Sequence, residues 1–179
     1  NRILRNHKDF VESGQAIVSE LRDKSCLKPD SHILELGCGC GRNAIALARF
    51  VDQGGTYIGQ DVDLQMIQWC QTHLQSDRVH FHHANLFSKV YNPKGTPITD
   101  YAFPANPDSI SLIVSISVFS HLLASDFAHY VRESSRVLST GSHLHMTLFL
   151  LDYLKGRLGD RWTFSHRRGD CYVDSLKYP

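Results

Sequence analysis

Three glycines stand at alternate positions in the stretch ELGCGCGRN, residues 35–43, directly after the apolar pair Ile33-Leu34. Glycine has no side chain to hold a ligand away from the main chain, so such a loop lets a ligand lie against the backbone. Where the loop leads from a strand into a helix, free N–H groups of the helix N-terminus also face the ligand. The stretch therefore predicts a ligand-binding loop.

The spacing and charge of this loop indicate the kind of ligand. A dinucleotide site has the pattern Gly-x-Gly-x-x-Gly, whereas here the third glycine comes one residue early, at Gly41, and Arg42 takes its place. Glu35 precedes the first glycine by two residues, where its charge would face a pyrophosphate unfavourably. The loop therefore suits a cationic ligand better than a dinucleotide.

Alternating strands and helices must position this loop. Apolar patterning predicts strands at 32–36, 56–60, 78–83, 110–116 and 143–150, and helices at 3–22, 42–51, 64–74 and 126–138. Asp63 is the expected N-cap of the third helix. This order predicts an α/β fold with a doubly wound, mostly parallel sheet and helices on both faces. In such sheets, ligands bind beyond the carboxyl ends of the strands.

Several segments together resemble the class I S-adenosylmethionine-dependent methyltransferases. ELGCGCGRN is similar to motif I of that family, whose pattern is acidic-x-Gly-x-Gly-x-Gly. The other similar segments, in the order of the family, are YIGQDVDLQMI, HFHHANLF, ISLIVSISVFSHLL and VRESSRVLSTGSHLHMTLFL. The resemblance covers residues 31–150 and implies a Rossmann-like methyltransferase fold that binds S-adenosyl-L-methionine.

The resemblance also implies roles for single residues. Asp61 would accept both ribose hydroxyls of the cofactor, because a carboxylate can take two O–H donors. Val62 and Met66 would line the adenine, and Asn85 stands where the family often has an Asp that receives the adenine amino group. The implied cofactor contacts are Glu35, Gly37, Cys38, Gly39, Gly41, Asn43, Asp61, Val62, Met66, Asn85, Leu86, Ser115 and Ile116.

The implied function is methyl transfer to an O or N atom of a small or carbohydrate-type acceptor by in-line displacement. His121 follows the fourth strand, where the family presents residues to the acceptor, and is the candidate general base. Two alternatives stay open: a cofactor-binding module without turnover that serves assembly or regulation, and a nicotinamide-dependent oxidoreductase. No Pro-Cys dipeptide is present for C5 methylation of cytosine through a cysteine nucleophile.

Two segments are candidates for the acceptor pocket. The proline-rich segment 86–108 carries Tyr91, Tyr101 and Phe103. The tail 151–179 carries basic and aromatic residues, which suit an anionic or sugar-like acceptor, a polynucleotide or a solvated lid. These tail residues are Lys155, Arg157, Arg161, Trp162, Phe164, His166, Arg167 and Arg168.

Composition limits the remaining classes of function. The chain has 179 residues, 42% of them hydrophobic and 21% charged, as in a single soluble domain. A net charge of +1 does not favour nucleic acid, and no apolar run approaches the roughly 18–20 residues that span a bilayer. The five cysteines form no CxxC pair, which favours a reduced, cytoplasmic setting.

Histidines and cysteines also raise the possibility of a metal site. The histidines of residues 80–83 and 143–145 alternate along two predicted strands, and Cys38 and Cys40 flank Gly39. The histidines have no cysteine or carboxylate cluster beside them in sequence, and small thiols fit a tight loop. We therefore expect no metal.

The chain is expected to form one methyltransferase domain, residues 1–179. Residues 1–30 would be an N-terminal helix and linker, 31–150 the cofactor-binding core, and 151–179 a basic and aromatic tail or lid. The family's sheet normally ends with two more strands, and no apolar run after Leu150 is long enough for a buried strand. We therefore expect the C-terminal strands to be missing. A longer protein, a partner or a second copy in a homo-oligomer would then cover the edge.

Overall fold

The computed structural model describes residues 7–24, 26–51, 53–89, 91–154 and 163–175. Its strands are β1 (His32–Leu36), β2 (Thr56–Asp61), β3 (Val79–His83), β4 (Ile110–Ser115), β5 (Leu138–Met146), β6 (His166–Arg168) and β7 (Cys171–Val173). Its α-helices are α1 (His7–Asp23), α2 (Arg42–Phe50), α3 (Leu64–His73), α4 (Ala124–Val137) and α5 (Leu151–Leu154). Two 3₁₀ turns, η1 (Ile98–Asp100) and η2 (Phe119–His121), complete the described elements.

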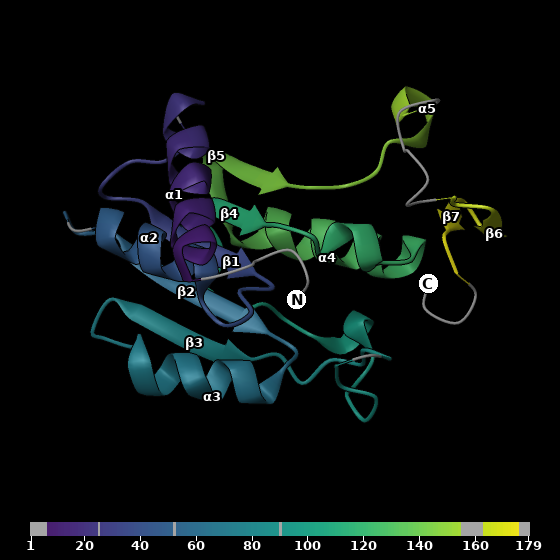
Figure 1. Cartoon of the computed structure of the whole chain (residues 1–179), viewed down its shortest axis with the longest axis horizontal. Coiled ribbons are helices and arrows are strands. Elements are labelled where there is room, and N and C mark those ends of the chain that lie inside the picture. The colour runs from purple at the N-terminus through teal and green to yellow at the C-terminus, as the bar shows by residue number, and fades with distance from the viewer. Residues whose placement is uncertain (1–6, 25, 52, 90, 155–162, 176–179) are drawn as a thin grey trace.

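Five strands form one sheet in the order β3-β2-β1-β4-β5, and every neighbouring pair in it is parallel. The strand order reverses between β1 and β4, so the loop after β1 lies at the switch point of the sheet. In Figure 1 the arrowheads of the strands point to one side, which we call the carboxyl edge. The predicted doubly wound, parallel sheet is confirmed.

Helices cover both faces of the sheet because buried side chains of the strands alternate between two apolar clusters. On β1, Ile33 lies in the first cluster with Leu21 of α1, Leu47 of α2 and Ile67 of α3. Leu34, the next residue, lies in the second cluster, to which α4 contributes the buried side chains of Tyr130 and Val137 and the partly buried Phe127. This alternation is the two-residue period expected of strands that are buried on both faces.

The second face is also covered by part of the proline-rich segment. Phe103 is buried there, and its ring packs edge-on against Tyr130 with 5.1 Å between ring centroids. Arg136 holds the segment in place: Nη1 and Nη2 donate to the carbonyls of Ala105 (3.1 Å) and Phe103 (3.2 Å). The Arg136 guanidinium is itself bonded by Nε and Nη2 to Glu133, whose Oε2 accepts from the Phe103 N–H. Residues 103–105 thus form a fixed cover of the sheet.

The fifth strand begins earlier than the expected 143–150. Ile110 pairs with Leu138 and Leu112 with His143, so four residues bulge out between the two pairs. Gly141 makes this possible with a φ of 81°. Beyond β5, the described part of the chain adds no further strand to the sheet. The expectation that a longer protein, a partner or a second copy covers the β5 edge of the sheet stays a prediction.

The described part of the tail lies on the side that the carboxyl edge faces (Figure 1). There β6 and β7 form a separate antiparallel hairpin. Asp174 supports it by accepting from the N–H and hydroxyl of Thr163 and the N–H of Phe164.

Other boundaries of the core elements differ from the predicted ones by a few residues, and predicted helix residues 3–6 lie outside the described part. No described helix is long and apolar enough to cross a membrane.

Candidate functional site

The glycine loop follows β1 at the carboxyl edge and is bonded to the neighbouring strand. The N–H groups of Gly37 and Cys38 both donate to the carbonyl of Gln60, at 2.8 and 3.0 Å. The N–H of Gly41 then donates to the carbonyl of Cys38 at 3.0 Å, which closes a tight turn before α2. All three glycines have left-handed φ angles of 53–83°.

The three glycines are required for different reasons. A Cβ on Gly37 would lie 2.3 Å from Cγ2 of Val118, and one on Gly41 would lie 2.5 Å from Cδ1 of Leu74. A Cβ on Gly39 would meet nothing closer than Sδ of Met66, at 3.8 Å. The surrounding protein therefore fills the space beside Gly37 and Gly41, whereas the space beside Gly39 is open to a ligand.

Gly39→Val is therefore expected to fold and to lose ligand binding. The valine would occupy the open space, and its left-handed backbone would cost about 1–2 kcal/mol of stability. Gly54→Val is a matched control, since Gly54 has a φ of 93° and no atom within 4 Å of its Cβ position. Calorimetry with S-adenosylmethionine should show loss of binding in Gly39→Val alone. Equal binding by both variants would mean that the loop is only a turn.

Asp61 ends β2 and faces the glycine loop. Its Oδ2 accepts from the N–H of Gly39 at 2.7 Å, and its Oδ1 accepts from the N–H of Asp63 at 2.9 Å. Each carboxylate oxygen can accept a further hydrogen bond, so hydroxyl donors of a ligand beside Gly39 can also be bound. Asp63 caps α3 by accepting from the N–H groups of Gln65 and Met66, which confirms the predicted N-cap.

Glu35 lies beneath the loop, and its side chain points into the interior. It is 1% exposed, and its carboxyl accepts from Nδ2 of Asn43 on α2 (2.7 Å) and from the hydroxyl of Tyr57 on β2. Burial raises the pKa of Glu35 to about 7, while hydrogen bonds from Tyr57 and Asn43 and the charge of Arg42 act in the opposite direction. The network ties Glu35, near the end of β1, to α2 through Asn43 and to β2 through Tyr57.

The residues predicted to contact an adenine are only partly gathered beside the loop. Met66 lies next to Gly39, and Val62 packs against the second cluster. Asn85 is exposed, with its Oδ1 accepting from Nδ2 of Asn92 at 3.0 Å. The side chain of Leu86 is fully buried in the second cluster and is thus directed away from solvent.

The segment after β4 reaches the glycine loop through Val118. Ser115 ends β4 with a buried Oγ that has no hydrogen-bond partner among the described residues, and Ile116 packs against the first cluster. Ser117 has an unusual φ of 60°, and its N–H donates to Oγ1 of Thr147 at 2.7 Å. The N–H of Thr147, the residue after β5, also donates to the carbonyl of Ser115 at 3.1 Å. This turn was not predicted from the sequence, because its bonds join residues about 30 positions apart.

His121 lies in η2, which is anchored by the buried ring of Phe119. That ring packs edge-on against Phe127 and Tyr130, with 5.2 and 5.9 Å between ring centroids. The His121 imidazole is exposed and has no hydrogen-bond partner in the described part of the chain, although its backbone N–H donates to the carbonyl of Val118. The backbone of η2, and not a side-chain hydrogen bond, therefore fixes the position of His121. His121 follows Val118, the residue beside Gly37, by three positions.

Two thiols at the glycine loop, those of Cys38 and Cys70, are buried, whereas the thiol of Cys40 is exposed. Burial raises the pKa of Cys38 well above its ordinary value, and it raises that of Cys70 on α3 to about 12. The Cys70 thiol donates to the carbonyl of Gly39 at 3.5 Å and so lies beneath the loop. Within the described ranges, no three His, Cys, Asp or Glu side chains are grouped to hold a metal ion.

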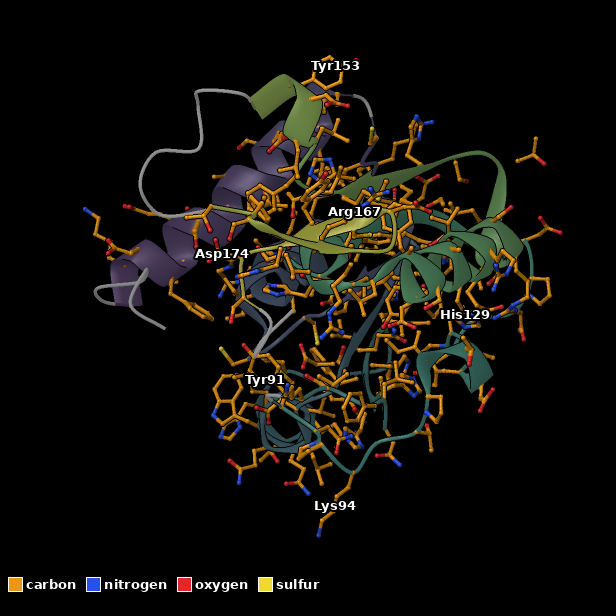
Figure 2. All side chains as sticks on the ribbon, turned by 90° about the vertical axis from the view of Figure 1, so that its right-hand side faces the viewer. Tyr91, Lys94, His129, Tyr153, Arg167 and Asp174 are labelled. Carbon is orange, nitrogen blue, oxygen red and sulfur yellow. The ribbon has the colours of Figure 1, made fainter. Side chains whose placement is uncertain are left out.

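The two candidate acceptor segments contribute differently to the carboxyl edge. Phe103 is buried, and the half-buried Tyr101 donates its hydroxyl to Oε1 of Gln60 at 3.2 Å, so neither is free to bind a substrate. Tyr101 is further fixed by its carbonyl, which lies 2.7 Å from Nε2 of His129. Figure 2 looks onto the carboxyl edge, where Tyr91 and Arg167 remain exposed. Four tail candidates, Lys155, Arg157, Arg161 and Trp162, lie outside the described residues.

Two hollows occur elsewhere in the described structure. One of about 310 Å³ lies between α1 and α2, and one of about 850 Å³ lies at the amino ends of β1, β2 and β4. Neither is lined by Asp61 or by residues 37–41. The candidate site is therefore the open space beside Gly39, and neither of these hollows is part of it.

Comparison with solved structures finds the same fold in proteins of low sequence identity. An S-adenosylmethionine-dependent methyltransferase from Aquifex aeolicus has a TM-score of 0.55 at 17% identity, over 83% of this chain and 65% of that one. One from Mesorhizobium loti has a TM-score of 0.54 at 18% identity, over 76% and 55% of the two chains. The [4+2]-cyclase SpnF has a TM-score of 0.55 at 19% identity, over 75% and 44%. The chain thus spans about half to two-thirds of the lengths of these proteins.

A family model described as a methyltransferase domain matches residues 33–141, which include the glycine loop, Asp61 and His121. The match covers more than half of the chain and begins and ends close to the 31–150 region identified from the motifs. The open space beside Gly39 and the acceptor atoms of Asp61 fit S-adenosylmethionine, the cofactor that the family implies. The chain belongs to the class I S-adenosylmethionine-dependent methyltransferase family.

Proposed function

We propose that this chain transfers a methyl group from S-adenosylmethionine to an O or N atom of a small or carbohydrate-type acceptor. The observation that carries the proposal is the contact between Asp61 and the N–H of Gly39, at 2.7 Å, beside space that no side chain fills. This contact brings the Asp61 carboxylate and a bare stretch of backbone together at the switch point of the sheet. Such a combination suits a ribose-containing ligand.

The residues of the chain would act mainly by positioning. S-adenosylmethionine supplies a methyl group on a sulfonium sulfur, which a nucleophilic atom displaces in line. Asp61 would hold the ribose hydroxyls, and Gly39 would let the ligand reach the backbone. His121, exposed on η2, would take the proton of the acceptor's hydroxyl or amine.

The acceptor class is inferred from the exposed side chains of the tail. His166, Arg167 and Arg168 form β6 and are exposed on the side that the carboxyl edge faces. Guanidinium groups bind carboxylates, phosphates and hydroxyl-rich molecules through several hydrogen bonds. The near-neutral chain, with a net charge of +1, makes a small acceptor a better match than a polynucleotide.

His121→Gln is expected to lower kcat by roughly 10²–10⁴-fold if the imidazole accepts the proton of the acceptor. The affinity for S-adenosylmethionine should stay within about twofold, because His121 is not assigned a cofactor contact. His80→Gln, at an exposed histidine of β3, is the control variant. An unchanged kcat in His121→Gln would show that positioning alone drives the transfer.

One observation favours a second candidate, a cofactor-binding module without turnover. Catalytic bases are usually oriented by a neighbouring group, yet no described side chain orients the imidazole of His121. A screen of acceptors with labelled S-adenosylmethionine separates the two candidates. Transfer to any oxygen or nitrogen acceptor supports the enzyme, whereas cofactor binding without transfer across the screen supports the module.

A further inference from the structure

Glu35 is a buried carboxyl group without a cationic partner. Its side chain is 1% exposed and forms no ion pair with any Lys, Arg or His of the described residues. The charged groups that act on it are Arg42, at the start of α2, and Asp61, at the end of β2. The negative form of Glu35 is therefore stabilised chiefly by its two hydrogen-bond donors, Tyr57 and Asn43.

The Tyr57 hydroxyl has little freedom to leave this position. The Tyr57 side chain is fully buried, and a Cβ on Gly59 would lie 2.9 Å from its hydroxyl oxygen. The same Cβ would lie 3.0 Å from both Sγ of Cys38 and Cδ1 of Phe81, so Gly59 leaves just enough room for these groups. The hydroxyl is thus fixed between the glycine loop and the Glu35 carboxyl.

The Asn43 amide allows the network to exist in two protonation states. Its Nδ2 donates to the Glu35 carboxylate, while its Oδ1 is buried and has no partner among the described residues. If the amide turns by 180°, Oδ1 takes the place of Nδ2 and can accept a proton from a neutral Glu35. Uptake of a proton therefore exchanges the hydrogen bonds of the network and leaves its residues in place.

We propose that Tyr57 and Asn43 are positioning residues that hold the Glu35 carboxyl beneath the glycine loop, where its charge favours the sulfonium form of the cofactor over the uncharged thioether. The inference rests on the proposed function of the site. Charged S-adenosylmethionine and its thioether product, S-adenosylhomocysteine, differ in the sulfonium charge but share the amino, carboxyl and ribose groups. A buried anion would distinguish them through the low dielectric of the interior.

The protonation of Glu35 makes this preference measurable. Its raised pKa of about 7 lies in an accessible range. A cation bound at the loop stabilises the negative form of Glu35 and lowers its pKa, so binding of the sulfonium releases a proton. The ratio of S-adenosylmethionine affinity to S-adenosylhomocysteine affinity should then rise by about three- to tenfold between pH 6 and pH 8. The shared amino group adds its own pH dependence, because the nearby sulfonium charge lowers its pKa in S-adenosylmethionine only, and the Glu35→Gln variant measures that part by itself.

Calorimetry of both ligands at pH 6, 7 and 8 tests the proposal. The wild-type ratio should rise with pH. In Tyr57→Phe the midpoint of this rise should move to higher pH, because the negative form loses a donor, and in Glu35→Gln only the change due to the ligand amino group should remain. Tyr130→Phe is the matched control, since Tyr130 is buried on the other face of the sheet and has no described bond from its hydroxyl.

Proton release provides an independent measurement. Binding enthalpies at pH 7 in buffers of different ionisation enthalpy should show that the difference in proton release between S-adenosylmethionine and S-adenosylhomocysteine is shifted toward release in the wild type relative to Glu35→Gln. The same difference in both proteins, or the same pH dependence of the affinity ratio in both, would overturn the inference and leave the proposed function standing. Absence of binding by both ligands at every pH would instead refute the cofactor site and the inference with it.

Discussion

Asp61→Ala is expected to weaken S-adenosylmethionine binding by about 2–4 kcal/mol, which is roughly a 30- to 1,000-fold rise in Kd. The variant removes the acceptor proposed for the ribose hydroxyls. It also removes the acceptor for the N–H of Gly39, which lies 2.7 Å from Oδ2. Both losses occur at the ligand-facing side of the glycine loop, so the effect should appear in binding more than in stability. Calorimetry measures it directly.

Two further variants separate these contributions. Asp61→Asn keeps one oxygen acceptor and should lose less affinity than Asp61→Ala. Asp63→Ala removes the N-cap of α3 and should cost about 1 kcal/mol of stability with little change in Kd, because the Asp63 carboxylate bonds to α3. Unchanged binding in Asp61→Ala would show that β2 does not supply the ribose acceptor.

Glu35→Gln is expected to remove a large pH dependence of stability. The folded pKa of Glu35 is raised to about 7 by burial, so between pH 4.5 and 7 the folded state holds more protons than the unfolded state. The contribution of Glu35 is therefore fully present below its unfolded pKa and is lost as the pH rises through about 7. The loss is on the order of 3 kcal/mol of unfolding free energy.

The measurement is the difference in unfolding free energy between wild type and Glu35→Gln at pH 5, 7 and 8.5. As the pH rises, the unfolding free energy of the wild type should fall relative to that of Glu35→Gln. Other carboxyls with lowered pKa, such as Glu133 beside Arg136, titrate in both proteins and cancel. Glutamine fits the site because a turned Asn43 amide can accept from it through Oδ1, the atom now without a partner. A difference that stays constant with pH would contradict the buried, proton-binding role of Glu35.

The sheet and the loop could be predicted because their signals are local. Strands that are buried on both faces are continuous apolar runs, and the glycine pattern and the Asp63 cap are each read within a few residues. The predicted site residues Asp61, Gly39 and Met66 are brought together by the same local elements, since β2 and α3 flank the loop.

Features that depend on distant parts of the chain were not predicted. Glu133 and Arg136 read as a surface i,i+3 pair, yet their bonds to Phe103 and Ala105 fix a segment about 30 residues earlier. Tyr57 gives no sequence sign of its bond to Glu35, apart from Gly59 on the same face of the strand. The early start of β5 at Leu138 depends on a bulge that only its pairing with β4 reveals.

The contact between Gly37 and Val118 has a consequence for how this enzyme class can diversify. A Cβ on Gly37 would lie 2.3 Å from Cγ2 of Val118, so the two positions share one small volume between the glycine loop and the segment after β4. A larger residue at 118 would push directly on the loop, and the next residue, Phe119, is fixed by the packing of its buried ring on Phe127 and Tyr130. The sizes of residues 37 and 118 should thus be linked in related sequences.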